Sequence, residues 1–180
     1  MSNELDEILQ LADKAVTSIS GVSVVDARWL FQSGRRSLEV TIHRPISRIS
    51  LDDCELMSRT LEKLLDESDP PVIDGAYILE VQSPGLEREL KSNREFAAFI
   101  GENVEVNTRE QIESLGWSFN GSLTSKDETT ITIAQPRPSS PPAKTNKKSG
   151  ASEPATALEA VTLKMDQVAR VKLHPQFQKN

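Results

Sequence analysis

A chain of 180 residues has room for one large domain or two small ones, and its 37% hydrophobic content can form a core although aromatic residues make up only 4%. No apolar run approaches the roughly 20 residues that cross a bilayer, and the N-terminus has no basic region followed by an apolar stretch. Together with a single cysteine, Cys54, which excludes an internal disulfide, this composition predicts a cytoplasmic protein.

The first half predicts a domain, residues 1–84, in the order helix, strand, strand, helix, strand. Apolar residues at helical spacing indicate the first helix at 4–19, and Gly21 follows in the position of a helix stop. Two half-buried strands come next, joined by a hairpin loop at 32–36. Their apolar faces consist of Val25, Ala27, Trp29 and Phe31 in one strand and Leu38, Val40 and Ile42 in the other.

A second helix is predicted to begin at Ser50, whose hydroxyl can cap free backbone amides. Asp52 and Asp53 then lie in the first turn, where the helix dipole favours negative charge. The helix fades at Asp66, and a strand at 77–81 completes an α-β-β-α-β unit, which forms a sheet with helices over one face.

The stretch LEVQSPGLEREL ends that strand and leads into the second domain. Pro84 suits the second position of a tight turn, and Gly85 is expected to supply the positive φ of the third position in a type II turn. We therefore predict an interdomain hinge at Ser83, Pro84, Gly85 and Leu86. The charged residues 87–89 are expected to face the cleft between the domains.

The second predicted domain, residues 85–180, has one short helix followed by strands. Ser92 and Glu95 have the spacing of a capping box, and Gly101 ends the helix. Five short strands after one helix favour a small β-barrel. The strands are expected at Asn103–Arg109, Trp117–Thr124, Thr129–Ala134, Ala160–Leu163 and Ala169–Leu173.

An insertion at 135–157 interrupts the predicted barrel. It contains five of the ten prolines, carries a net charge of +3 and has no residue that would anchor a core. Such a segment cannot bury enough apolar surface to offset its ordering entropy, so it is expected to be disordered. It is either a solvated loop or a flexible basic arm that touches RNA.

Residues that carry catalytic or metal chemistry are sparse. One cysteine and two distant histidines, His43 and His174, form no metal-ligand pattern. Ser83 lacks the G-x-S-x-G context and a base at a suggestive spacing, and the turn lacks the glycines and lysine of a P-loop. The sequence therefore predicts no catalytic residue, no metal and no cofactor.

Three separated motifs carry recognisable patterns: YILEVQSPGLERELKSNREFAAFIGENVEV at 77–106, LDDCELMSRTLEKLLD at 51–66 and VKLHPQF at 171–177. Together they resemble the ribosome maturation factor RimP family. The resemblance covers nearly the whole chain in order, and only the insertion has no counterpart. The chain departs from the family pattern at Gln82 (usually Ser), Glu87 (usually Asp) and Glu89 (usually Pro). The lost proline at 89 is expected to loosen the hinge.

The resemblance implies an α+β architecture, with an N-terminal α/β domain and a C-terminal Sm-like barrel. It further implies a non-enzymatic assembly factor that binds the free small ribosomal subunit through its twelfth ribosomal protein, near the decoding centre, mainly through the barrel. We expect a monomer without membrane association, in which ribosomal RNA is a further partner. The candidate partner-binding residues are Arg88, Arg94, Arg109, Arg170 and Lys172.

Charge is distributed unevenly between the halves. Residues 1–90 contain 17 acidic and nine basic residues, net −8, whereas residues 91–180 contain ten acidic and 12 basic, net +2. The acidic half either steers the protein toward a basic ribosomal protein or serves solubility. Two other functions stay open: a general RNA-binding module that uses the barrel and its basic loop, and a hydrolase built on Ser83.

Overall fold

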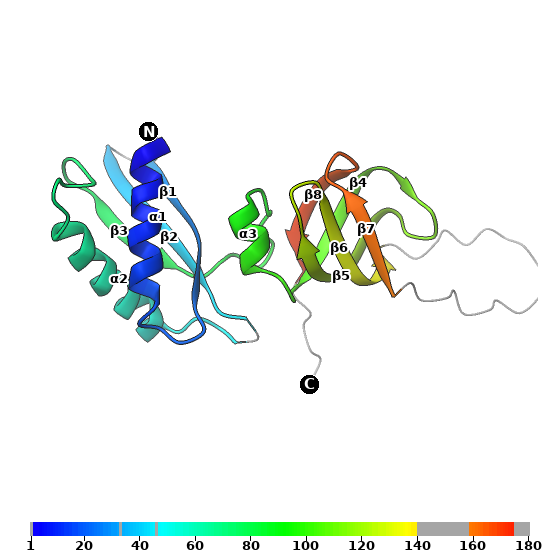
Figure 1. The fold of residues 1–180 in the computed structure, drawn as a ribbon, viewed down its shortest axis with the longest axis horizontal. Coiled ribbons are helices and arrows are strands. Elements are labelled where there is room, and N and C mark those ends of the chain that lie inside the picture. The colour runs from blue at the N-terminus through cyan, green and yellow to red at the C-terminus, as the bar shows by residue number, and fades with distance from the viewer. Residues whose placement is uncertain (1, 33, 46, 140–158, 175–180) are drawn as a thin grey trace, which may run out of the picture. The chain divides into compact units, whose positions relative to one another are not determined.

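The computed structural model describes residues 2–32, 34–45, 47–139 and 159–174, and the chain divides into two compact units, residues 1–85 and 86–180 (Figure 1). Each unit has its own sheet, so the protein is of the α+β class. Within the described ranges, every helix is too short or too polar to cross a membrane.

The first unit has the predicted order of elements. The elements are α1 (Ser2–Val16), β1 (Ser23–Gln32), β2 (Arg35–His43), α2 (Leu51–Asp66) and β3 (Ile78–Gln82). Its sheet has the order β1-β2-β3, with β1 antiparallel and β3 parallel to the central β2. A parallel neighbour requires a crossover connection, and α2 supplies it between β2 and β3.

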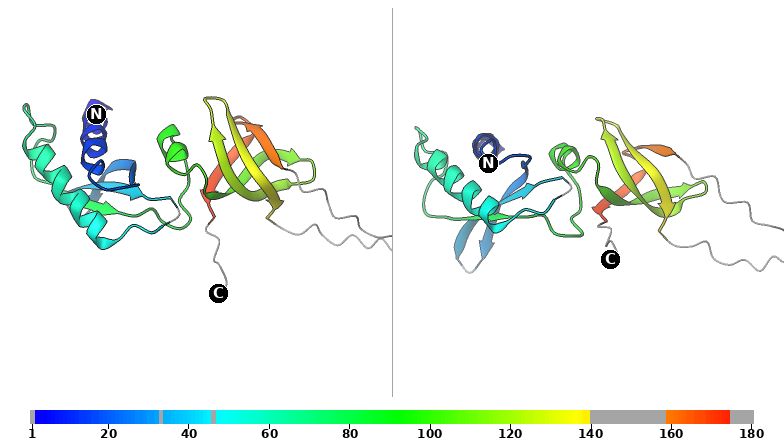
Figure 2. Two further views of the ribbon diagram at one scale, coloured as in Figure 1. Left: turned by 60° about the horizontal axis from the view of Figure 1, so that its bottom comes forward. Right: turned by 90° about the horizontal axis from the view of Figure 1, so that it is seen from below.

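The core of the first unit lies between the two helices and one face of the sheet (Figure 2). Leu38, Val40 and Ile42 alternate along β2 and are completely buried in one cluster with Ile8 of α1 and Leu61 of α2. A strand places alternate side chains on opposite faces, so Glu39 and Thr41 lie on the other face of β2.

One predicted face in the first unit is wrong. A β-bulge between Val24 and Asp26 shifts the register, so Ala27 and Trp29 contact the core while Val25 is buried outside its main cluster. Phe31 lies beyond the core at the hairpin end and is 75% exposed. Because a bulge adds one residue, the alternation cannot continue unbroken from Val25 to Phe31.

The predicted cap of the second helix is confirmed. Ser50 Oγ accepts from the Asp53 backbone N–H at 3.1 Å, and Asp53 accepts from the Ser50 N–H at 2.8 Å. Arg44 donates to both Asp53 oxygens at 3.0 and 2.8 Å. The Arg44 hydrogen bonds and those from Ser50 lower the pKa of Asp53 to about 2, so this carboxylate joins the end of β2 to the start of α2.

The second unit is a short helix with a five-stranded antiparallel sheet. The elements are α3 (Asn93–Ala98), β4 (Asn103–Ile112), β5 (Gly116–Lys126), β6 (Thr130–Pro138), β7 (Ala160–Lys164) and β8 (Val168–Leu173). The sheet order is β7-β6-β5-β4-β8. The five predicted strands are present, but no strand pairing among the described residues joins β7 to β8, so the sheet does not close into the predicted small barrel.

The predicted insertion begins too early. Residues 135–138 belong to β6, where Arg137 pairs with Asn120 and Pro138 with Phe119. Gly121 permits this close approach, since a Cβ there would lie 2.4 Å from Ile133 Cγ2 and 2.7 Å from the Ala134 carbonyl oxygen. The remainder of the predicted insertion lies outside the described residues, apart from position 139.

Candidate docking surface

The segment that follows the Ser-Pro-Gly stretch is bound to β8. The Leu90 N–H donates to the Val171 carbonyl at 2.9 Å, and the Leu173 N–H donates to the Arg88 carbonyl at 2.9 Å. Glu89 and Lys172 form an isolated antiparallel bridge between these two bonds. Residues 88–90 therefore extend the sheet by a short strand-like pairing along the outer edge of β8.

Arg88 has a structural role inside the second unit. Its guanidinium donates to Glu95 Oε1 at 2.9 and 2.8 Å, and only 13% of the Arg88 side chain and 8% of the Glu95 side chain are exposed. Burial alone raises the pKa of Glu95, but hydrogen bonds from the Ser92 and Lys91 amides and from Arg88 outweigh it and lower that pKa. Glu95 also completes the predicted capping box with Ser92.

The predicted type II turn at Pro84-Gly85 is wrong. The φ of Gly85 lies outside the left-handed region, and a Cβ built there meets no atom within 4 Å. The chain turns instead at residues 86–87, where Leu86 is 63% exposed. The turn lies later than predicted because residues 88–90 pair with β8, so the chain must change direction just before residue 88.

The outer face of the second sheet brings two of the predicted partner residues together, Arg170 and Lys172, and a third, Arg109, lies further along β4. Val104, Val106 and Val171 point into the core, so Arg170 and Lys172 of β8 lie on the opposite face. Arg109 follows on β4, is exposed, and donates from Nε to the Val168 carbonyl at 3.2 Å. The remaining candidate, Arg94, lies half-buried on α3.

The strand register arranges this outer sheet face in rows. Arg137, Asn120, Glu105 and Lys172 are successive partners across β6, β5, β4 and β8, and Arg170 pairs with Asn107 in the next row. We define the outer sheet face by its polar residues. They are Asn103, Glu105, Asn107, Ser118, Asn120, Ser122, Arg137, Arg170 and Lys172.

Hydrogen bonds order the middle of this face. Ser118 Oγ donates to Glu105 Oε1 at 2.9 Å, and Ser139 Oγ donates to Asn120 Oδ1 at 3.3 Å. A small cavity of about 70 Å³ opens at one end of the face. Its polar lining consists of Asn103, Asn120, Ser122, Gln135, Arg137 and His174.

Sequence reasoning missed Arg137, Asn120 and Asn107 as surface residues. Arg137 lies within the segment 135–157 that the sequence predicts to be disordered. The alternation of polar with apolar residues at 103–107 and 118–123 is the signal that could have found the other two.

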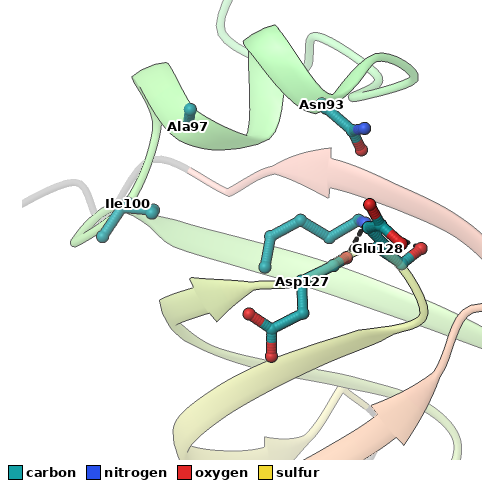
Figure 3. A pocket seen from close by; sticks show the side chains of 6 residues that line it. Asn93, Ala97, Ile100, Asp127 and Glu128 are labelled. Carbon is teal, nitrogen blue, oxygen red and sulfur yellow. Dashed lines mark hydrogen bonds between the residues drawn. The ribbon is translucent and has the colours of Figure 1, made fainter.

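A larger hollow of about 410 Å³ lies between α3 and the β5–β6 turn (Figure 3). Ala97 and Ile100 border it on the helix side, with Asp127 and Glu128 across from them. Lys126 Nζ donates to the backbone carbonyls of Asp127 and Glu128. Within the described part of the chain, no group of three or more His, Cys, Asp or Glu side chains could hold a metal ion.

The fold and the outer sheet face together define a two-unit α+β protein with a polar surface suited to a macromolecular partner. Residues 11–87 match the model of the RimP N-terminal domain. The ribosome maturation factor RimP of Rippkaea orientalis is 40% identical over 134 residues, 73% of this chain and 83% of that protein. The ribosome maturation factor RimP of Microcystis aeruginosa is 37% identical over 133 residues, 73% and 81% of the two chains. The chain therefore belongs to the RimP family.

Proposed function

We propose that this protein is a non-enzymatic maturation factor of the small ribosomal subunit, which acts in the cytoplasm by docking on free subunits. Membership of the RimP family carries the proposal. The two relatives are named ribosome maturation factor, and this chain matches more than four fifths of the length of each. The polar rows of the outer sheet face support a docking role, since they offer donors and acceptors over an open surface.

The proposed partner is a basic small-subunit ribosomal protein near the decoding centre. The first unit contains 15 acidic and eight basic residues, net −7, which would attract such a protein and repel bare phosphate. In this proposal the second unit is an Sm-like domain, the joint between the units lies at residues 83–86, and the protein acts as a monomer.

A titration with that ribosomal protein at rising salt tests this docking. We expect affinity to fall as ionic strength rises from about 0.05 to 0.5 M, because exposed charges are increasingly screened. Salt-independent binding, or no binding, contradicts the electrostatic part of the proposal.

The runner-up function is a general RNA-binding module. Arg137, Arg170 and Lys172 on one face favour it specifically. A gel shift with ribosomal RNA fragments separates the two functions. The leading function expects weak binding in the absence of the small-subunit context, whereas a general module binds the fragments tightly and without preference.

A further inference from the structure

We propose that the outer sheet face of the second unit binds a double-stranded segment of RNA across its minor groove. This inference rests on the proposed function, in which the partner is the small subunit, and adds a second contact to the protein-mediated one. Its premise is the distribution of charge and hydrogen-bonding groups over the rows of the face.

Cations lie on β6 and on β8, on either side of the centre of the face. In the row Arg137–Asn120–Glu105–Lys172, the register places Arg137 on β6 and Lys172 on β8, three strands apart. Strands lie about 4.8 Å apart, so the two backbones are separated by roughly 14 Å. Arg170 adds a second cation on β8. Beyond β8 the row continues to Glu89, which is bridged to Lys172 and lies 4.0 Å from Lys91 Nζ. A duplex groove is bordered by the phosphate backbones of two strands. The long side chains on β6 can reach one of these backbones, and those on β8 can reach the other.

The centre of the face is nearly neutral. Asn107, Ser118 and Asn120 present amide and hydroxyl groups between the cations on β6 and those on β8. The wide, shallow minor groove of duplex RNA displays 2′-hydroxyls and base edges, which such groups bind. Glu105 is the one carboxylate among the nine residues that define the face, is held by Ser118, and is separate from Glu89, which pairs with Lys172 beyond β8. Glu105 lies between Asn120 and Lys172 in the row, where a 2′-hydroxyl can donate to its carboxylate.

Single-stranded RNA fits this face poorly. Single-stranded sites stack bases on aromatic side chains. The outward positions of β4, β5, β6 and β8 in the described residues hold no Phe, Tyr or Trp, and His174 at the end of the face is the one ring beside the cavity. Trp117 is 59% exposed, but it alternates with Ser118 and so points to the other side of β5. The 70 Å³ cavity is far below the ~300 Å³ of an ordinary ligand pocket, so it does not enclose a flipped base.

The first test compares nucleic acids on the full chain. The probes are an RNA hairpin with a stem of about 16 base pairs, a single strand of matched composition, and a DNA duplex of the same sequence. We expect the hairpin to bind about tenfold more tightly than either of the others, because only it combines paired phosphate strands with 2′-hydroxyls. Equal affinity for all three would overturn the inference.

The second test uses two variants that remove the same charge. Arg170→Gln with Lys172→Gln removes two cations from β8, and Arg59→Gln with Lys63→Gln removes two exposed cations from α2. The β8 variant is expected to lose about tenfold in hairpin affinity and to flatten the log–log salt slope by about 2. The α2 variant should bind as the unmodified protein does, and equal losses in both variants contradict the inference.

Sedimentation of the same proteins with small subunits separates the two proposals. If the protein sediments with subunits but shows no preference for the hairpin, docking rests on a ribosomal protein and the duplex site is wrong. If the hairpin preference holds but no subunit association is found, the proposed function is wrong and the RNA site stands alone.

Discussion

The guanidinium of Arg88 lies against the carboxylate of Glu95, with nitrogen–oxygen distances of 2.9 and 2.8 Å, and both side chains are largely buried. Because Glu95 also accepts from the Ser92 and Lys91 amides at 2.8 Å, a single carboxylate holds the start of the second unit to α3. The proposed joint at residues 83–86 therefore lies before this buried pair.

Arg88→Ala should destabilise the second unit by about 3 kcal/mol, because it leaves a buried carboxylate without its partner. Urea unfolding measures the lost free energy of unfolding. Hydrogen exchange of the Leu90 and Leu173 amides shows whether the loss is local to this segment. The matched control is Arg59→Ala, which breaks the exposed pair with Glu55 and should cost less than about 0.5 kcal/mol. A similar small cost at Arg88 would show that the buried pair does not hold this segment.

Asp53 should make stability depend on pH in acid. Its pKa is lowered to about 2 in the folded protein, against 3.8 for the free side chain. A depressed pKa stabilises the fold above about pH 4, and that stabilisation is lost as pH falls toward 2. Unfolding free energies from pH 5 to 2 should therefore fall more steeply in the unmodified protein than in Asp53→Asn.

Glu95→Gln serves as the comparison for the Asp53 experiment, because the pKa of Glu95 is lowered as well but in the other unit. Its effect should appear in the unfolding of the second unit. Parallel pH curves for the unmodified protein and Asp53→Asn would contradict the role of the Arg44–Asp53 pair.

Two glycine substitutions should have opposite outcomes. Gly121→Ala forces a Cβ against Ile133 and the Ala134 carbonyl and should cost about 2 kcal/mol. Gly85→Ala meets no neighbouring atom and strains no backbone angle, so stability should be unchanged or rise slightly through the unfolded state. Thermal unfolding of both variants checks this, and a loss at residue 85 as large as that at 121 is the contrary result.

Shortening the segment between β6 and β7 should depend on where the cut begins. Deletion of residues 141–157 spares the β6 pairings of Arg137 and Pro138, and loop length changes closure entropy only slowly, so melting temperature should shift little. Deletion of 136–156 removes those pairings and should destabilise the second unit clearly. Equal effects of the two deletions would show that the end of β6 contributes nothing.

Local signals predicted much of this fold. The cap at Ser50, the capping box at Ser92, the helical spacing of α1 and α2, and the alternation along β2 each depend on residues a few positions apart. The misplaced features depend on distant contacts. The turn at 86–87 follows from pairing with β8, and β6 continues past residue 135 because Gly121 lets it approach.

The candidate surface was predicted only in part for the same reason. Arg109, Arg170 and Lys172 were found by their charge, but whether they share a face depends on strand register. Arg88 has the same charge, but its guanidinium is buried in an ion pair with Glu95. Composition alone cannot distinguish a buried structural arginine from an exposed one.

The proposed function requires association with free small subunits. Ultracentrifugation of the protein with purified small subunits and, separately, with assembled ribosomes measures this directly. We expect the protein to sediment with free small subunits and to stay in the supernatant with whole ribosomes. Equal association with both particles, or none with either, would contradict the proposed role.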